Sequence, residues 1–244
     1  MKTKLCAFLV FSLFCIIIPQ KSFSQITFNF GPTIGATLPI GKYGGGVDDF
    51  YNLDKYGSKI GGNFGAVGKL KFPFLVNVQG FINYNISSRS GDIYPGTVEI
   101  DRNIFMLGLG PEVGFPIPAT NLRPYAGVDF IMSIFSGKVS FNNVADDLNG
   151  EHNFSKDTRL GMGFKAGVEL KLTNFTIDLN AKYSILNLFK KEFVSDTSRI
   201  SNYINLNDDV DPAYTPGSVL HPIGDKRIIS AFQFNISIIY KVSI

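Results

Sequence analysis

The chain has 244 residues, of which 45% are hydrophobic and 18% charged, and its formal net charge is +3. So weak a charge argues against nucleic acid or another highly charged polymer as a partner. Both cysteines, Cys6 and Cys15, lie near the N-terminus, which argues against a fold stabilised by disulfides.

The N-terminal 24 residues have the pattern of a secretory signal peptide. Two lysines precede an apolar stretch, Leu5–Ile18, and small residues lead up to Ser24. The apolar stretch is shorter than the ~20 residues that a membrane-spanning helix needs. We therefore expect a signal peptide at 1–24 and, after cleavage, a single domain at 25–244. Cleavage removes three lysines from the 23 basic residues, and the remaining 20 equal the 20 acidic residues.

From Ile26 to Ile40, apolar residues alternate with polar residues or glycine. A period of two predicts a β-strand with one apolar and one polar face, and this run is longer than the usual strand of a globular protein. Seven later segments alternate in the same way: Ile60–Lys71, Leu75–Ile86, Ile104–Phe115, Pro124–Ser133, Leu160–Lys171, Phe175–Ile185 and Ile228–Ile244.

The connections between these segments alternate in length. Short ones at 72–74, 116–123 and 172–174 alternate with long ones at 41–59, 87–102, 134–159 and 186–227. This rhythm is typical of an antiparallel up-and-down barrel. We expect an all-β transmembrane barrel of eight strands with short periplasmic turns and long extracellular loops. A ten-stranded barrel is the alternative, because the last long loop could contain a hairpin around Ile200–Leu206.

The distribution of charge indicates that the apolar face meets lipid. Only ten charged residues fall in the expected strands, and the polar face otherwise consists of Asn, Thr, Ser, Gln and Gly. A water-facing outer wall would need more charges, whereas a closed sheet pairs every backbone polar group inside a membrane. Seven aromatic residues near the short-turn end are expected to form an interfacial girdle: Phe28, Phe72, Phe74, Phe115, Tyr125, Phe175 and Tyr240.

Charged residues on the polar face are expected to pair inside the barrel. Six of them make up what we call the lumen charge network: Glu112, Asp129, Lys165, Glu169, Asp178 and Lys182. Lys69 and Lys241 are expected to face inward as well. An unpaired buried charge is costly, so opposite charges should pair across the lumen and close it, which is a structural role. The alternative is a gated path for ions or protons.

Catalytic patterns are weak in this sequence. Both histidines, His152 and His221, lie in expected long loops, so no expected strand carries a histidine that could act as a base. A protease site at the rim is a minor alternative, because His221 shares its loop with three acidic residues: Asp208, Asp209 and Asp211. We expect no enzyme activity and no cofactor.

Two oxygen-rich loop stretches could hold calcium, 146–151 and 205–211. Neither has the spacing of an EF-hand loop, with its central glycine and final glutamate. We therefore expect solvated loops here and no metal site.

Several stretches resemble the small outer-membrane β-barrels of Gram-negative bacteria. They are Gln25–Phe28 directly after the signal, the glycine-rich Gly31–Gly35, Arg123–Val128 at the opening of the fifth segment, and the alternating Phe232–Ile244 at the end. The mature chain is similar to the OmpA/OmpX-type barrels, and more closely to the PorT-like group. The resemblance implies a position in the cell outer membrane and says little about activity.

Together, these patterns predict a non-enzymatic barrel that has a structural role or binds a ligand through four long extracellular loops. The PorT-like resemblance implies an alternative, an accessory component of an outer-membrane secretion or transport machine. A narrow ion pore is a third hypothesis. The expected partners are outer-membrane lipid and either an extracellular ligand or secretion-machine proteins, with no nucleic acid.

Overall fold

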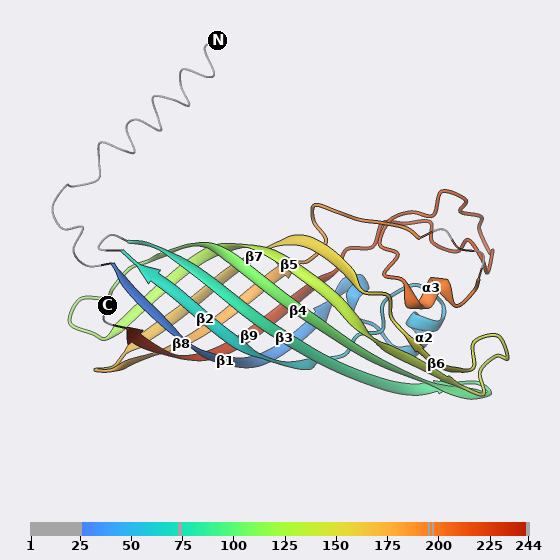
Figure 1. Ribbon diagram of the computed structural model, residues 1–244, viewed down its shortest axis with the longest axis horizontal. Coiled ribbons are helices and arrows are strands. Elements are labelled where there is room, and N and C mark those ends of the chain that lie inside the picture. The colour runs from blue at the N-terminus through green and yellow to red at the C-terminus, as the bar shows by residue number, and fades with distance from the viewer. Residues whose placement is uncertain (1–25, 73–74, 195, 197, 243–244) are drawn as a thin grey trace, which may run out of the picture.

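The computed structural model describes residues 26–72, 75–194, 196 and 198–242. The expected signal peptide at 1–24, and Phe74 of the expected girdle, lie outside these residues. In the described part, one antiparallel sheet contains nine strands (Figure 1): β1 (Thr27–Ile40), β2 (Gly61–Lys71), β3 (Val76–Ile93), β4 (Gly96–Gly114), β5 (Leu122–Asn142), β6 (Gly150–Asn153), β7 (Asp157–Lys171), β8 (Phe175–Ile185) and β9 (Ser230–Val242).

Eight of these strands close into a barrel. Neighbours in the ring pair antiparallel in chain order, and β9 pairs with β1 to complete the closure. The exception is β6, which pairs with the far end of β5 and leaves β5 to pair directly with β7. The expected eight-stranded up-and-down barrel is therefore confirmed.

The ten-stranded alternative is wrong. Within 200–206 the chain forms a short helix, α3 (Ser201–Ile204), in place of a hairpin. Tyr203 of this helix is buried, with its ring centroid 5.5 Å from that of Phe50 and 5.3 Å from that of Phe141. Aromatic packing in a loop core, and not strand pairing, determines the structure of this segment.

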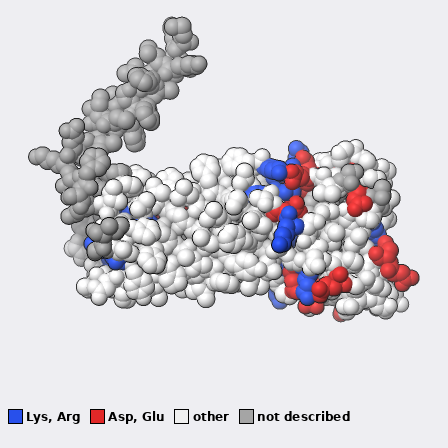
Figure 2. Space-filling view, in the orientation of Figure 1, with Lys and Arg blue, Asp and Glu red and all other residues white. Residues whose placement is uncertain are grey.

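The outer wall of the barrel is apolar over much of its length. Phe30, Ile34 and Leu109 are each more than half exposed on this wall, whereas their inward neighbour Asn29 is buried. Figure 2 shows the charged side chains gathered toward one end of the molecule, with a broad uncharged stretch beside them. We call this stretch the apolar belt, and it confirms that the apolar face is the outer one. Among the described residues no helix is long and apolar enough to cross a membrane.

Three strands continue well beyond the apolar belt. The expected long loop at 87–102 is wrong, because β3 and β4 run on as a paired hairpin to a turn at Tyr94-Pro95. The expected loop at 134–159 also begins as strand, since β5 extends to Asn142. Three long loops and one tight hairpin therefore stand where four long loops were expected.

In this extension the apolar residues lie on the inward side of the strands, opposite to their side in the belt. On β4, Val98 and Ile100 point inward and are buried, while Glu99 points outward and is exposed. Water replaces lipid outside this part of the wall, so the apolar side of each strand turns inward to a core. The pattern of outward apolar residues therefore ends at the edge of the belt, although the strand continues.

The extracellular end is covered by a folded cap. It consists of residues 41–60, which contain the helices η2 (Gly41–Tyr43) and α2 (Val47–Tyr51), and residues 186–229, which contain α3. We call these two segments the extracellular cap. Figure 1 shows both of them beside the extended part of β3, β4 and β5. Val47 and Phe50 of the first segment and Tyr203 of the second form one core with buried residues of the wall such as Ile100.

Candidate functional site

The periplasmic half of the lumen contains a cluster of ion pairs centred on Lys69 of β2. Its Nζ lies 2.8 Å from Asp178, 2.9 Å from Glu169 and 3.1 Å from Glu112, measured to carboxylate oxygens. The three acids come from β8, β7 and β4, so this single cation joins four strands across the lumen. All four side chains are buried, and such charges are tolerated only when paired.

A second cluster surrounds Asp129 of β5. Its carboxylate accepts from Lys165 at 2.9 Å and lies 3.4 Å from Nζ of Lys182. The two lysines face each other in the β7–β8 register, so the acid between them offsets their repulsion. Nζ of Lys182 also lies 3.3 Å from the ring centroid of Phe81. The structure thus places all six residues of the lumen charge network inside the barrel.

Three further residues join these clusters and were missed from the sequence. Arg123, expected in a turn, donates from Nη1 to Glu112 at 3.0 Å and to Glu169 at 3.2 Å. Lys71 donates to Glu169 at 2.7 Å. The hydroxyl of Tyr125 donates to Asp178 at 2.7 Å.

One expectation about side-chain direction is wrong. Tyr125 is buried in the lumen and does not belong to an outer girdle. Tyr125 lies four residues before the inward Asp129 on β5, so the alternation of the sequence alone would have predicted that it faces inward. Lys241 has the same parity along β9 as the buried Asn235 and Ser237, and it is exposed because the wall ends there.

The lumen above the ion pairs is filled by an amide layer and an apolar cluster. Thr37 donates to Asn85 at 2.7 Å, Asn63 donates to Thr37 at 3.1 Å, and Gln233 donates to Asn85 at 2.7 Å. Buried apolar side chains, among them Ile104 and Met106, continue the filling up to aromatic residues of the extracellular cap. Side chains therefore occupy the lumen from the ion pairs to the cap.

A buried ion pair holds the cap to the barrel wall. Nε and Nη2 of Arg159, at the start of β7, each lie 3.0 Å from an oxygen of Asp208 in the cap. Asn187 also donates to Asp208, at 2.7 Å. Burial alone would lower the pKa of Arg159, but the hydrogen bonds and charge of Asp208 outweigh it and raise this pKa.

A second cation, Arg102 of β4, lies beneath the cap among aromatic rings. Its Nε donates to the carbonyl oxygen of Tyr56 at 3.1 Å, and its guanidinium lies 4.3 Å from the ring centroid of Phe154. Burial lowers the pKa of Arg102 to about 10. The faces of the rings stabilise the charge in place of water, so this residue also ties the cap to the wall.

The residues considered for a protease site at the rim do not form one cluster. Asp208 is engaged by Arg159, and Asp209 lies 3.5 Å from Lys226. Asp211 and His221 do meet, with 2.9 Å between Oδ2 and Nδ1. His152, the other histidine, contacts the carbonyl oxygen of Leu148.

The oxygen-rich loops are occupied by local contacts. In the stretch 146–151, Asp147 pairs with Arg199 at 3.3 Å and Glu151 pairs with Lys138 at 2.7 Å. Within the described ranges, no group of three His, Cys, Asp or Glu side chains converges as a metal site would require.

Comparison with known proteins gives one family. A family model described as an outer membrane protein beta-barrel domain matches residues 6–212. A search of curated proteins found no match.

Several solved structures are similar in outline. Neisserial surface protein A is 10% identical with a TM-score of 0.48, and the alignment covers 88% of this chain and 97% of that one. Ail, the attachment invasion locus protein of Yersinia pestis, in complex with the heparin analogue sucrose octasulfate, is 12% identical with a TM-score of 0.42, covering 88% and 99%. The N-terminal β-barrel domain of Pseudomonas aeruginosa OprF is 10% identical with a TM-score of 0.40, covering 89% and 98%.

Proposed function

Because the chain belongs to the family of outer membrane protein β-barrel domains, we propose that it is a non-enzymatic surface-binding barrel whose extracellular cap recognises a protein outside the cell. The mature form in this proposal is the single domain at 25–244, after removal of the signal peptide at 1–24. The barrel itself lies in the outer membrane, and the apolar belt is its lipid-facing surface.

The observation that carries the proposal is an exposed apolar tip on the cap. Tyr214, Val219 and Leu220, in the longest loop, expose 45%, 58% and 41% of their surfaces on the extracellular side. The backbone N–H of Thr215 donates to the carbonyl oxygen of His221 at 3.2 Å, which brings the two ends of this stretch together. Apolar groups that face water on one stretch of surface are typical of protein-binding sites. We call Tyr214, Val219 and Leu220 the cap tip.

The cap beneath this tip is packed in a way that favours recognition. The rings of Phe50, Phe141 and Tyr203 pack against one another in one core. The ion pair between Arg159 and Asp208 holds the same loop to the wall. A loop held in one conformation loses less entropy when it binds a partner. Binding residues on a rigid scaffold are also the common arrangement in proteins.

The lumen charge network has a structural role in this proposal. Its ion pairs, the amide layer and the apolar cluster leave the interior occupied by side chains, which supports closure against a narrow ion pore. An eight-stranded barrel has an interior just wide enough for its own side chains.

The test replaces the cap tip in living cells. Cells with the triple variant Y214S/V219S/L220S are compared with wild type for attachment to immobilised fibronectin, laminin and fibrinogen and to cells of their own strain. V194S, an equally exposed apolar residue of the same loop, is the matched control. We expect attachment to fall in the triple variant and to stay unchanged in the control.

The same cells distinguish the secretion-machine alternative. The amount of exported protein in the culture medium should not change in the triple variant if the cap is a binding surface. Lost export with unchanged attachment would favour the accessory role in a secretion or transport machine. Wild-type cells that attach to none of these surfaces would contradict the proposal.

A further inference from the structure

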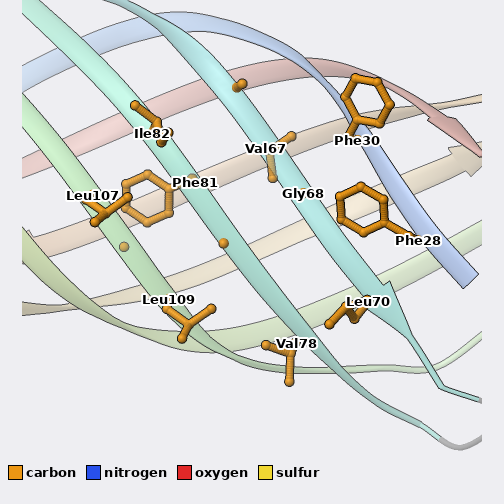
Figure 3. A pocket seen from close by; sticks show the side chains of 13 residues that line it. Phe28, Phe30, Val67, Gly68, Leu70, Val78, Phe81, Ile82, Leu107 and Leu109 are labelled. Atoms are coloured by element: carbon orange, nitrogen blue, oxygen red, sulfur yellow. The ribbon is translucent and has the colours of Figure 1, made fainter. Parts of the chain in front are cut away.

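A hollow of about 690 Å³ lies on the lipid-facing side of β1 to β4 (Figure 3). Phe28 and Phe30 stand on one side of it, and Leu107 and Leu109 stand on the other. Every residue that lines it is apolar or glycine. It lies in the periplasmic half of the belt, since its lining residue Leu70 directly follows Lys69 of the ion-pair cluster.

Two missing side chains create the hollow. In the register of the sheet, Phe30 pairs with Gly68, Gly68 with Gly80, and Gly80 with Leu109. The four residues therefore form one row across four strands, with large side chains at its ends and glycine at its two central positions. Both glycines are at outward positions of their strands.

The fold itself does not require glycine at these two positions. A Cβ on Gly68 would approach the Phe28 ring to 3.4 Å, and one on Gly80 would approach Leu109 to 3.6 Å, which are ordinary contacts. By contrast, a Cβ on the neighbouring Gly65 would lie 1.9 Å from a backbone oxygen. Glycine weakens a strand and often marks a place where a ligand approaches the backbone closely.

The exposed charge at the periplasmic rim is basic. Lys241 at the end of β9 and Lys171 at the end of β7 are both exposed. Lys241 lies beside the start of β1, opposite Asn29. The acids at this height, such as Glu169, are buried in the lumen. Figure 2 likewise shows blue and no red at this end of the visible face. A negatively charged group just outside the membrane core would meet positive charge here.

We propose that the hollow binds one acyl chain of an inner-leaflet phospholipid whose phosphate lies near Lys241. Lipid already surrounds the hollow, so burial from water does not favour the bound chain over bulk lipid. Close van der Waals packing against Phe28, Phe30 and Leu109 favours it, together with attraction between phosphate and lysine.

The test fills the hollow and counts bound lipid. The protein is reconstituted with phosphatidylglycerol, transferred to mild detergent and weighed by native mass spectrometry. Wild type should retain one phospholipid, and G68L/G80L should lose it. G62L is the matched control, because Gly62 is an outward glycine of the same strand with no atom within 4 Å of an added Cβ. It should retain the lipid.

A second pair of variants tests the headgroup contact. Lys241→Gln should weaken retention roughly fivefold, the effect of one lysine near an anionic group. Lys171→Gln, an exposed lysine at the end of β7 and away from the hollow, should leave retention unchanged. Equal effects of the two substitutions would remove the phosphate contact from the proposal.

A third measurement does not depend on the variants folding. A phosphatidylglycerol with a photoreactive group in its acyl chain should label wild-type peptides within residues 64–82 above other outward segments. Uniform labelling around the barrel, or equal lipid retention in folded G68L/G80L and wild type, would overturn the proposal. A two-copy mass that disappears in G68L/G80L would assign the hollow to a second copy instead.

Discussion

Lys69 shows how much of the lumen depends on a single side chain. Its ammonium lies within 3.1 Å of Asp178, Glu169 and Glu112, and all four groups are buried. The sequence placed these acids on inward positions of separate strands, but their common partner depends on the relative heights of four strands. The role of Arg123 was not predicted from the sequence, because this residue lies at the start of β5, where too little alternation precedes it to show which way it faces.

Replacing Lys69 should be costly. Lys69→Met leaves three buried carboxylates short of their cation, and the free energy of unfolding should fall by about 3–5 kcal/mol. Urea unfolding followed by tyrosine fluorescence measures it, since the chain contains no tryptophan. The control Lys138→Met removes an exposed ion pair with Glu151 and should cost much less, because solvent screens such a pair. Similar losses for both would refute this account of Lys69.

Tyr56 of the cap should give stability a dependence on alkaline pH. Its hydroxyl donates to the carbonyl oxygen of Leu206 at 2.7 Å, and burial raises the pKa of Tyr56 to about 12. The folded state therefore holds this proton more tightly than the unfolded state, whose value is about 10. The raised pKa contributes about 2–3 kcal/mol to the free energy of unfolding. This contribution is complete below pH ~10 and is lost as the pH rises through ~12.

The variant Tyr56→Phe isolates this contribution from the other tyrosines. The difference in free energy of unfolding between wild type and Tyr56→Phe is measured in urea from pH 8 to pH 12. It should be constant at the lower end and shrink as the pH rises. A difference that does not vary with pH would show that the phenol is not protonated preferentially in the folded cap.

At the scale of the element, alternation predicted each strand only within the apolar belt. The limits of β8 matched the expected Phe175–Ile185, because lipid faces its whole length. The hairpin of β3 and β4 was expected to be a loop, because its apolar residues turn inward where water is outside. A pattern in which the outward residues are apolar therefore predicts only the part of a strand that lies in lipid, and not the part that lies in water.

Strand β2 offers a test of why glycine is frequent on inward positions. A Cβ on Gly65 would lie 1.9 Å from the carbonyl oxygen of Ile82, whereas one on Gly62 would meet nothing within 4 Å. Gly65→Ala should lower the free energy of unfolding by roughly 1–3 kcal/mol, the cost of overpacking. Gly62→Ala should change it by less than about 0.5 kcal/mol. Equal urea midpoints for the two variants would contradict the close approach of β2 and β3.

At the scale of the whole molecule, the filled lumen predicts that the barrel does not conduct. Ion pairs, amides and apolar side chains occupy it in turn, and the cap covers its extracellular end. Purified protein in a planar bilayer should show no stable open state in single-channel recordings. A stable conductance that passes hydrated ions would rule out a closed lumen and revive the narrow pore.

The sequence by itself determined the all-β class, the up-and-down barrel and the face that meets lipid, whereas the count of eight strands needed the helix α3. Each strand has to present an apolar face to lipid on its own. The alternation with period two and the scarcity of charge are therefore visible in each strand's own sequence. Only the tertiary structure decided the ion partners in the lumen and the extracellular cap. Those features depend on the relative heights of strands and on contacts such as Arg159 with Asp208, which lie 49 residues apart. No local pattern encodes such a contact, because it exists only after the barrel has closed.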